Sequence, residues 1–417
     1  MKTTRTLLAW LLAIMISSSG FIACSSDDSP KDLNVVSIMA GTIDLNGATS
    51  PVDVPVKPTI VITFDTNINP TTATASNIKL TQDYDDADVA LEISVTDKVL
   101  SITPVANLGS GTLYSMSISA GLLNDDDQPL ASTTRTFTTA GTFSPAGLVA
   151  HWTFEDSAND IVGDFDPASS AIVDVTYTAS RNAKAGKAAT FNGSTTIIEI
   201  ANGDDLITSS DLTLSFWMKT NSSGKTNGHF VMGLGAHFGL QYEVFGGYDG
   251  AKFAVRYELA NAETAAEDMW FPSEATDASN GGWQGWDFAK SLTATQMMAI
   301  LKDNWVQVTL TYNAESKKTT LYYNGEKMKS YDFNLWPDAD AKKTATGVTF
   351  AGTAPEVVNE FAFGFIQSRA GTMWDAESWG GYDFPDAQHF KGQLDDVKVY
   401  HKTLTANEIK LMYDSEK

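Results

Sequence analysis

Aromatic side chains that could bind sugars cluster in the second half of the sequence, beside glycines, amides and carboxylates. Two such segments are residues 283–287 (WQGWD) and 379–383 (WGGYD). An aromatic ring can stack on the apolar C–H face of a sugar, while neighbouring polar groups bind its hydroxyls. We therefore predict a carbohydrate-binding site. Its candidate contact residues are Trp270, Trp283, Trp286, Trp374, Trp379 and Tyr382.

These aromatic residues, together with Trp336, fall in segments longer than a bare β-sandwich needs. We expect them in loops, where a rigid scaffold displays binding residues. The alternative is that the insertions fold back and bury their own rings in satellite clusters. Three other tryptophans fall inside alternating strand patterns and are predicted to pack in the core. They are Trp152, Trp217 and Trp305.

The sequence does not show the pair of carboxylates that hydrolysis of a glycosidic bond requires. Retaining glycosidases hold two carboxylates about 5 Å apart, which on one strand means residues an even number apart. Glu356, Glu360 and Glu377 occur singly, and the adjacent Asp395 and Asp396 are expected to point to opposite faces. We predict that the protein is not an enzyme, with an unrecognised glycoside hydrolase as an alternative.

The histidines do not have the spacing of a metal centre. His229 and His237 could share one strand face only without a turn between them, and Gly233 and Gly235 indicate a turn. We expect single histidines to be packed or surface side chains.

The N-terminal residues have the layout of a secretory signal. Lys2 and Arg5 precede an apolar run from Leu7 to Ile16 that is too short to cross a bilayer. Small residues then lead to Cys24, the only cysteine in the sequence. We predict a signal peptide at residues 1–23.

Residues 21–24, Phe-Ile-Ala-Cys, resemble a bacterial lipobox, although Phe21 stands where Leu is usual. The resemblance implies cleavage before Cys24 and lipidation of its thiol. Lipidation would explain a lone cysteine in a secreted protein, because one cysteine cannot form a disulfide within the chain. The alternative is a soluble secretory signal with an unused cysteine.

Residues 24–33 are predicted to form a flexible acidic tether, because residues 25–32 (SSDDSPKD) are polar and cannot pack. The stretch also resembles the export signal of lipoproteins on the outer face of the outer membrane in glycan-harvesting Gram-negative bacteria. We therefore expect a cell-surface-exposed outer membrane lipoprotein, attached to the membrane through its lipid anchor only. The alternative is a plain solvated linker.

The charge of the chain argues against nucleic acid as a partner. The formal net charge is −23, from 28 Lys and Arg against 51 Asp and Glu. Binding to a phosphate backbone requires a basic stripe, and the sequence has none. An acidic surface suits neutral glycans or Ca²⁺ better, although acidity also serves solubility alone.

Residues 34–140 read as short alternating strands, as where Ile60, Ile62 and Phe64 alternate with smaller or polar residues. The segments 99–104, 108–114 and 135–139 resemble a bacterial Ig-like domain family, whose modules usually act as spacers. The Gly- and Pro-containing residues 141–147 form a joint to a second domain.

Residues 147–417 read as a larger set of aromatic-rich strands. Asn324-Gly325 predicts a tight hairpin turn, and capping boxes at Thr293 and Thr405 predict short helices. Six segments occur in the order of a concanavalin A-like, laminin-G-type jelly roll, which the region resembles. They are residues 148–156, 186–193, 212–219, 305–312, 321–326 and 390–400. The expected fold is all-β, with an Ig-like β-sandwich followed by a larger concanavalin A-like jelly-roll β-sandwich.

The resemblance also implies a structural Ca²⁺ that ties the first strand of the jelly roll to the last. The implied ligands are Asp156, Asp160, Asp164 and Asp395. Backbone carbonyls and water would complete the six to eight oxygens that Ca²⁺ takes. The alternative role for Asp395 and Asp396 is turn capping and surface charge.

Together these features predict a lectin-like domain displayed on an Ig-like spacer. We expect it to bind a polysaccharide or oligosaccharide and to retain it for a glycan-uptake system, with other outer-membrane glycan-uptake proteins as potential partners; this link is by analogy of architecture. The alternative from another class is an adhesin or structural surface protein that binds a protein partner.

Overall fold

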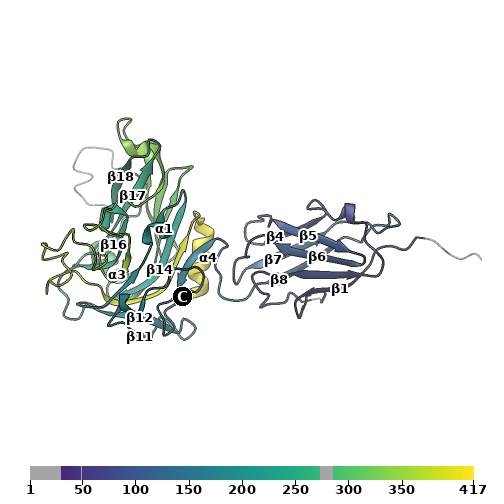
Figure 1. Ribbon diagram of the computed structural model, residues 1–417, viewed down its shortest axis with the longest axis horizontal. Helices are drawn as coiled ribbons and strands as arrows, with labels where there is room; N and C mark the ends of the chain where they lie inside the picture. Colours follow the sequence, from purple (N-terminus) through teal and green to yellow (C-terminus); the bar gives the residue numbers. More distant parts are fainter. Residues whose placement is uncertain (1–29, 48, 273–284) are drawn as a thin grey trace, which may run out of the picture.

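The structure is a computed structural model that describes residues 30–47, 49–272 and 285–417. Figure 1 shows two β-domains placed end to end, with the smaller, N-terminal one on the right and the larger one on the left. The predicted all-β class is confirmed. In the described part of the chain, no helix is long and apolar enough to cross a membrane.

The N-terminal domain consists of two antiparallel sheets, ordered β2-β1-β3-β6-β5 and β4-β7-β8. Its strands are β1 (Val35–Ala40), β2 (Ile43–Asp44), β3 (Ile60–Phe64), β4 (Ile78–Gln82), β5 (Leu91–Thr96), β6 (Val99–Pro104), β7 (Leu113–Ile118) and β8 (Thr133–Thr138). The predicted alternation in β3 is confirmed, because Ile60, Ile62 and Phe64 are all buried. Alternate side chains of a strand point the same way, so these three face the core of the domain.

The C-terminal domain packs two large sheets together. The first, which we call the site sheet, has the order β10-β13-β24-β15-β16-β17-β18, with β23 paired to β17. Its strands are β10 (Ile172–Val173), β13 (Ile197–Ile200), β15 (His229–Gly233), β16 (Leu240–Val244), β17 (Ala251–Leu259), β18 (Thr264–Phe271), β23 (Ala345–Val348) and β24 (Phe361–Phe363).

The second sheet, which we call the back sheet, has the order β11-β12-β25-β14-β20-β21-β22-β19, with β9 paired to β25. Its strands are β9 (Leu148–Trp152), β11 (Thr176–Ala179), β12 (Lys187–Asn192), β14 (Leu212–Thr220), β19 (Trp286–Ala289), β20 (Trp305–Asn313), β21 (Lys318–Tyr323), β22 (Glu326–Asp332) and β25 (Lys391–Tyr400). The predicted tight turn joins β21 to β22, where Asn324 and Gly325 both have positive φ, at 51° and 73°.

Aromatic rings from both sheets meet in the core between them. Trp152 of β9 packs against Phe363 of β24 with ring centroids 5.2 Å apart, and Phe216 of β14 against Tyr242 of β16 at 5.4 Å. The predicted burial of Trp152 is therefore confirmed.

The helices are short, and both predicted capping boxes are present, at Thr293 and Thr405. The α-helices are α1 (Gly203–Ile207), α3 (Ala294–Leu301) and α4 (Ala406–Glu416), and the 3-10 helices are η1 (Pro70–Thr72), η2 (Ser169–Ala171), η3 (Ala236–Phe238), η4 (Phe333–Leu335) and η5 (Ala341–Thr344). The C-terminal helix α4 covers Trp217, which is buried there and donates its Nε1–H to Glu416 at 2.7 Å. The remaining strand tryptophan, Trp305, is only half-buried.

The joint between the domains is packed against both of them. Ser144 exchanges two backbone hydrogen bonds with Ser110 of the Ig-like domain, at 2.9 and 3.0 Å. Its hydroxyl also lies 2.6 Å from the hydroxyl of Tyr400 in β25. From the Ig-like side, the Tyr84 hydroxyl donates to Glu408 of α4 at 3.0 Å. These contacts fix the spacer against the larger domain.

Two buried histidines make the larger domain sensitive to acid. Burial lowers the pKa of His229 to about 3 and that of His389 to about 4. Below about pH 6.5, the ordinary pKa of histidine, these two side chains bind protons in the unfolded chain but not in the folded protein. Stability is therefore lost as pH falls from about 6.5 towards these lower values, by roughly 1.4 kcal/mol per pH unit for each histidine.

We expect the urea midpoint of the His229→Gln variant, measured relative to that of the unmodified protein, to be constant above pH 7 and to rise as pH falls from 6.5 to 5, because the variant lacks one of the buried histidines. The comparison isolates His229, because the raised pKa values of Asp395 and Glu267 change stability with pH in the opposite direction, and do so equally in both proteins. A difference between the two midpoints that is the same at pH 6.5 and at pH 5 would contradict the assignment of His229 as neutral.

Candidate functional site

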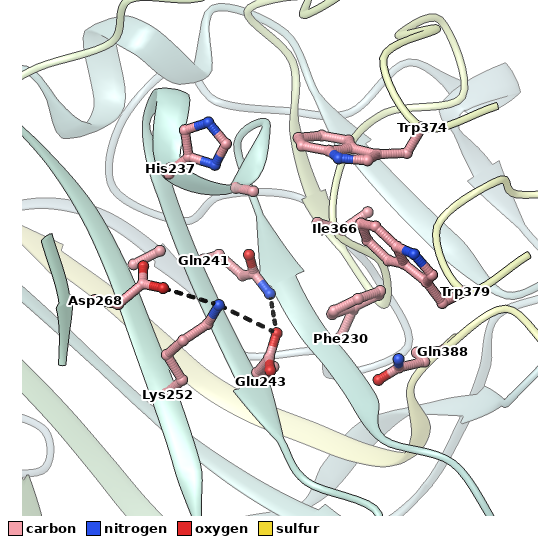
Figure 2. Close-up of a pocket in the computed structure, with 12 residues that line it drawn as sticks. Phe230, His237, Gln241, Glu243, Lys252, Asp268, Ile366, Trp374, Trp379 and Gln388 are labelled. Atoms are coloured by element: carbon pink, nitrogen blue, oxygen red, sulfur yellow. Dashed lines mark hydrogen bonds and ion pairs between the residues drawn. The ribbon is translucent and has the colours of Figure 1, made fainter. Parts of the chain in front are cut away.

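A cleft of about 390 Å³ lies on the site sheet. In β16, Leu240, Tyr242 and Val244 are buried in the core between the sheets, so Gln241 and Glu243 face the other way, into the cleft. Figure 2 shows the cleft between this strand face and two indole rings. The residues that line it are Phe230, Ala236, His237, Gln241, Glu243, Lys252, Ala254, Asp268, Ile366, Trp374, Trp379 and Gln388.

Two indole rings form one side of the cleft, which we call the aromatic wall. Trp374 is 9% exposed and Trp379 is 36% exposed, and their ring centroids lie 6.3 Å apart. Both belong to residues 364–390, the long connection between β24 and β25. Phe230 packs edge-on against Trp379 at 6.1 Å, and His237 against Trp374 at 6.4 Å. The wall is thus held against the sheet by Phe230 of β15 and by His237 of η3, the short helix between β15 and β16.

A charged network forms the floor of the cleft, as Figure 2 shows. The Lys252 ammonium lies 3.2 Å from an Asp268 carboxylate oxygen and 3.9 Å from one of Glu243. The Gln241 side-chain amide donates a hydrogen bond to Glu243. Burial raises the pKa of Glu243, and Lys252 opposes that rise. Because the floor groups are already bonded to one another, they are held in place before any ligand arrives.

His237 adds a group that can both donate and accept hydrogen bonds. Burial lowers its pKa, and the nearby Arg256 lowers it further, so the imidazole is neutral at pH 7. A neutral imidazole has one N–H donor and one acceptor nitrogen.

The register of the sheet aligns the floor residues into rows that cross the strands. Successive Cα partners on β15, β16, β17 and β18 make up the first row, which consists of Phe230, Glu243, Lys252 and Trp270. The second row lies beside it on β16, β17 and β18 and consists of Gln241, Ala254 and Asp268. Polar residues in the second row flank Ala254, whose small side chain leaves room above the floor.

These groups can bind a carbohydrate. The wall offers apolar ring surface, and the floor offers carboxylate, amide, ammonium and imidazole groups for hydroxyls. A site for a small ligand usually combines aromatic surface with a few polar groups that point towards the same space.

The structure does not bring all six predicted sugar-binding residues to one site. Trp374 and Trp379 line the cleft together. Tyr382 does not line it, because its hydroxyl donates to the Thr195 carbonyl and its ring packs against Phe365 and His389. It supports the connection that carries the wall.

The expected loop positions of Trp270 and Trp286 are wrong. Trp270 lies in β18, at the end of the first row, and Trp286 lies in β19 of the back sheet, packed beside the core. Trp336 is not in a loop exposed for binding or in a satellite cluster, since it is buried against Tyr331 and Phe333 in the main core. Trp283 and Cys24 lie outside the described residues.

The sequence analysis did not predict the floor residues, although the pattern of β16 indicates a polar face. Its sequence, LQYEV, places Gln241 and Glu243 between three apolar residues, as in a strand with one polar face. The partners Lys252 and Asp268 lie on other strands, and only the register of the sheet brings them together.

The four predicted calcium ligands are not brought together. Asp156 pairs with Lys187 at the surface, whereas Asp160 accepts hydrogen bonds from the backbone N–H groups of His151, Val162 and Gly163. Asp395 lies 2.5 Å from the Arg181 guanidinium. Among the described residues, no group of three or more His, Cys, Asp or Glu could hold a metal ion. Asp164 is therefore in no such group, and these residues do not fit a Ca²⁺ site.

The expectation that Asp395 and Asp396 point to opposite faces is also wrong. A bulge shifts the register between β14 and β25 at this point, and Asp396 has a φ of 44°. Both carboxylates therefore reach Arg181, each at 2.5 Å, and Asp396 also bonds His151 at 2.9 Å. The charges next to Asp396 hold its pKa well below the usual range, whereas burial and Asp396 itself raise the pKa of Asp395.

Two family matches cover much of the described chain. Residues 42–139 match the family described as a bacterial Ig-like domain. Residues 192–363 match the family described as the concanavalin A-like lectin/glucanases superfamily. The aromatic wall lies beyond the second match, so the match does not account for it. No curated protein matches the sequence.

Similar solved structures include binding domains of bacterial toxins, at low identity. The receptor binding domain of botulinum neurotoxin type G is 12% identical, with 64% of this chain and 51% of that one covered and a TM-score of 0.37. The binding domain of Paraclostridial Mosquitocidal Protein 1 is 15% identical, with 64% and 52% covered and a TM-score of 0.40. The chain spans about half the length of these structures.

The fold and the family matches together identify the two domains of the chain. The two sheets of residues 35–138 contain the first matched region, and the two larger sheets of residues 148–400 contain the second. The chain thus consists of a bacterial Ig-like domain followed by a concanavalin A-like, laminin-G-type domain.

Proposed function

We propose that this protein binds carbohydrate in the cleft and does not cleave it. The observation that carries the proposal is the pairing of the Trp374 and Trp379 indoles with a floor of hydrogen-bonding groups that is already assembled. Each stacked ring contributes about 1 kcal/mol beyond the area it buries. The affinity should therefore lie in the micromolar to millimolar range.

The charges of the cleft favour an uncharged glycan. Glu243 and Asp268 provide two carboxylates against the one ammonium of Lys252, and the chain as a whole has a net charge of −23. A polyanionic glycan would meet repulsion both during approach and in the cleft.

The test is a panel of plant, host and microbial polysaccharides in native affinity gels, with reducing ends assayed in parallel. Retardation by a neutral polymer without new reducing ends is the expected result. If no polymer retards the protein, the binding of a protein partner becomes the better proposal. New reducing ends that disappear in the Glu243→Gln variant would instead identify a glycoside hydrolase that uses the cleft carboxylates.

We also propose that the protein is a lipoprotein on the surface of the outer membrane and retains polysaccharide for a glycan-uptake system. The sequence around Cys24 supports the anchor, and the packed Ig-like domain supports a spacer role. The Cys24→Ala variant should move from the membrane fraction to the soluble periplasmic or secreted fraction. A Cys24→Ala protein that stays in the membrane fraction, or a wild-type protein that protease cannot reach on whole cells, would contradict this placement.

A further inference from the structure

The first row of floor residues has an aromatic ring at each end. Phe230 supports Trp379 at one end, and Trp270 lies at the other, with Glu243 and Lys252 between them. The row crosses four neighbouring strands. Since adjacent strands are about 4.8 Å apart, its ends are separated by roughly 14 Å.

Trp270 is held in place but remains partly open. Phe245 packs against the indole with ring centroids 5.0 Å apart, and the Lys252 ammonium lies 5.2 Å from its centroid. The residue is half-buried, so part of the ring faces solvent on the same side of the sheet as Lys252. Trp270 therefore offers ring surface just beyond the end of the cleft.

The second row leaves a path between the two aromatic ends. Ala254 is the register partner of both Gln241 and Asp268, and its small side chain lies between their polar groups. A ligand that lies along the rows would pass over Ala254. It would find hydrogen-bonding groups on both sides and an aromatic ring at each end.

We infer that the cleft binds a linear, uncharged oligosaccharide that lies across strands β15 to β18, and that Trp270 forms the far subsite. The inference rests on the proposed function, because it assumes that the aromatic wall binds sugar. A span of three strand intervals is longer than one sugar ring, so a monosaccharide would reach only one of the two aromatic ends. The charge balance of Glu243, Lys252 and Asp268 selects against uronate or sulfate groups in the middle of the chain.

Isothermal titration calorimetry of the two-domain protein tests this, with a length series of the neutral oligosaccharide whose polymer retards it in the gels. Wild-type affinity should rise with chain length and level off once the chain spans the row. The Trp270→Ala variant should lose about tenfold in affinity for the longest oligosaccharide and little for the shortest. The Trp270→Phe variant should retain part of the length effect.

Phe288→Ala is the matched control, because Phe288 is 40% exposed on β19 of the back sheet and also has a lysine ammonium above its ring. It should bind every oligosaccharide as the wild type does. Equal losses for short and long oligosaccharides in Trp270→Ala would overturn the subsite, since they would mean that Trp270 only positions Lys252. An affinity that does not depend on length would overturn it too, whereas a wild type that binds no oligosaccharide would overturn the proposed function itself.

Discussion

Replacement of both Trp374 and Trp379 by alanine is expected to abolish retardation of the protein by its polysaccharide, with a loss of affinity of about a hundredfold. The two rings supply the apolar surface of the cleft, and each stacked aromatic ring accounts for roughly tenfold in binding. The floor alone would exchange hydrogen bonds with water for hydrogen bonds with hydroxyls, at a small net gain.

The two rings need different variants, because they are buried to different extents. Trp374 is 9% exposed and packs in a small cluster with Phe230, Phe365 and Ile366, so its removal also leaves a cavity. Trp379 is 36% exposed, and Trp379→Ala alone should lower affinity about tenfold without changing the unfolding midpoint. Phe384→Ala is the control, since Phe384 is 39% exposed in the same connection and does not line the cleft. Equal binding by Trp379→Ala and Phe384→Ala would mean that the wall is not the sugar platform.

Arg181→Ala is expected to destabilise the larger domain by about 3–5 kcal/mol, the usual cost of removing one partner from a buried ion pair. The Arg181 side chain is 6% exposed and bonds Asp395 and Asp396 at once, so its removal takes the guanidinium away from the buried Asp395 and the half-buried Asp396. Its guanidinium also lies 4.6 Å from the centre of the Trp217 ring, and its Nε–H donates to the Glu416 carbonyl at 2.8 Å. Urea unfolding followed by tryptophan fluorescence measures the change.

The controls for Arg181 separate lost charge pairing from lost packing. Lys187→Ala removes the exposed pair with Asp156 and should cost less than about 1 kcal/mol. Adding Asp396→Asn to Arg181→Ala should recover part of the loss, because it removes the negative charge next to Asp395 that the guanidinium no longer balances. If Arg181→Ala is no less stable than Lys187→Ala, the cluster is not a buried ionic network.

Much of the fold could be predicted because its signals are local. The alternation of Ile60, Ile62 and Phe64 reflects the two faces of a strand, and Asn324-Gly325 supplies the positive φ values that a tight turn needs. The capping boxes at Thr293 and Thr405 are likewise contained within four residues each.

The site could be predicted only in part, since it depends on which strands become neighbours. The wall tryptophans were found by their composition, but Glu243, Lys252 and Asp268 meet only after β16, β17 and β18 have paired in one register. Likewise, strict alternation cannot show a bulge, so the convergence of Asp395 and Asp396 was not predictable.

The packed joint between the domains determines how a bound glycan would be presented. Because Ser144 and Tyr84 make hydrogen bonds between the Ig-like domain and the jelly roll, we expect the two domains to move as a single arm. With the proposed anchor at Cys24, the predicted tether would be the pivot of that arm. The cleft would then move over a hemispherical shell at a nearly constant distance from the anchor, instead of through the whole hemisphere. A captured polymer would be presented repeatedly at that distance, which favours transfer to a protein whose entrance lies within reach of the arm.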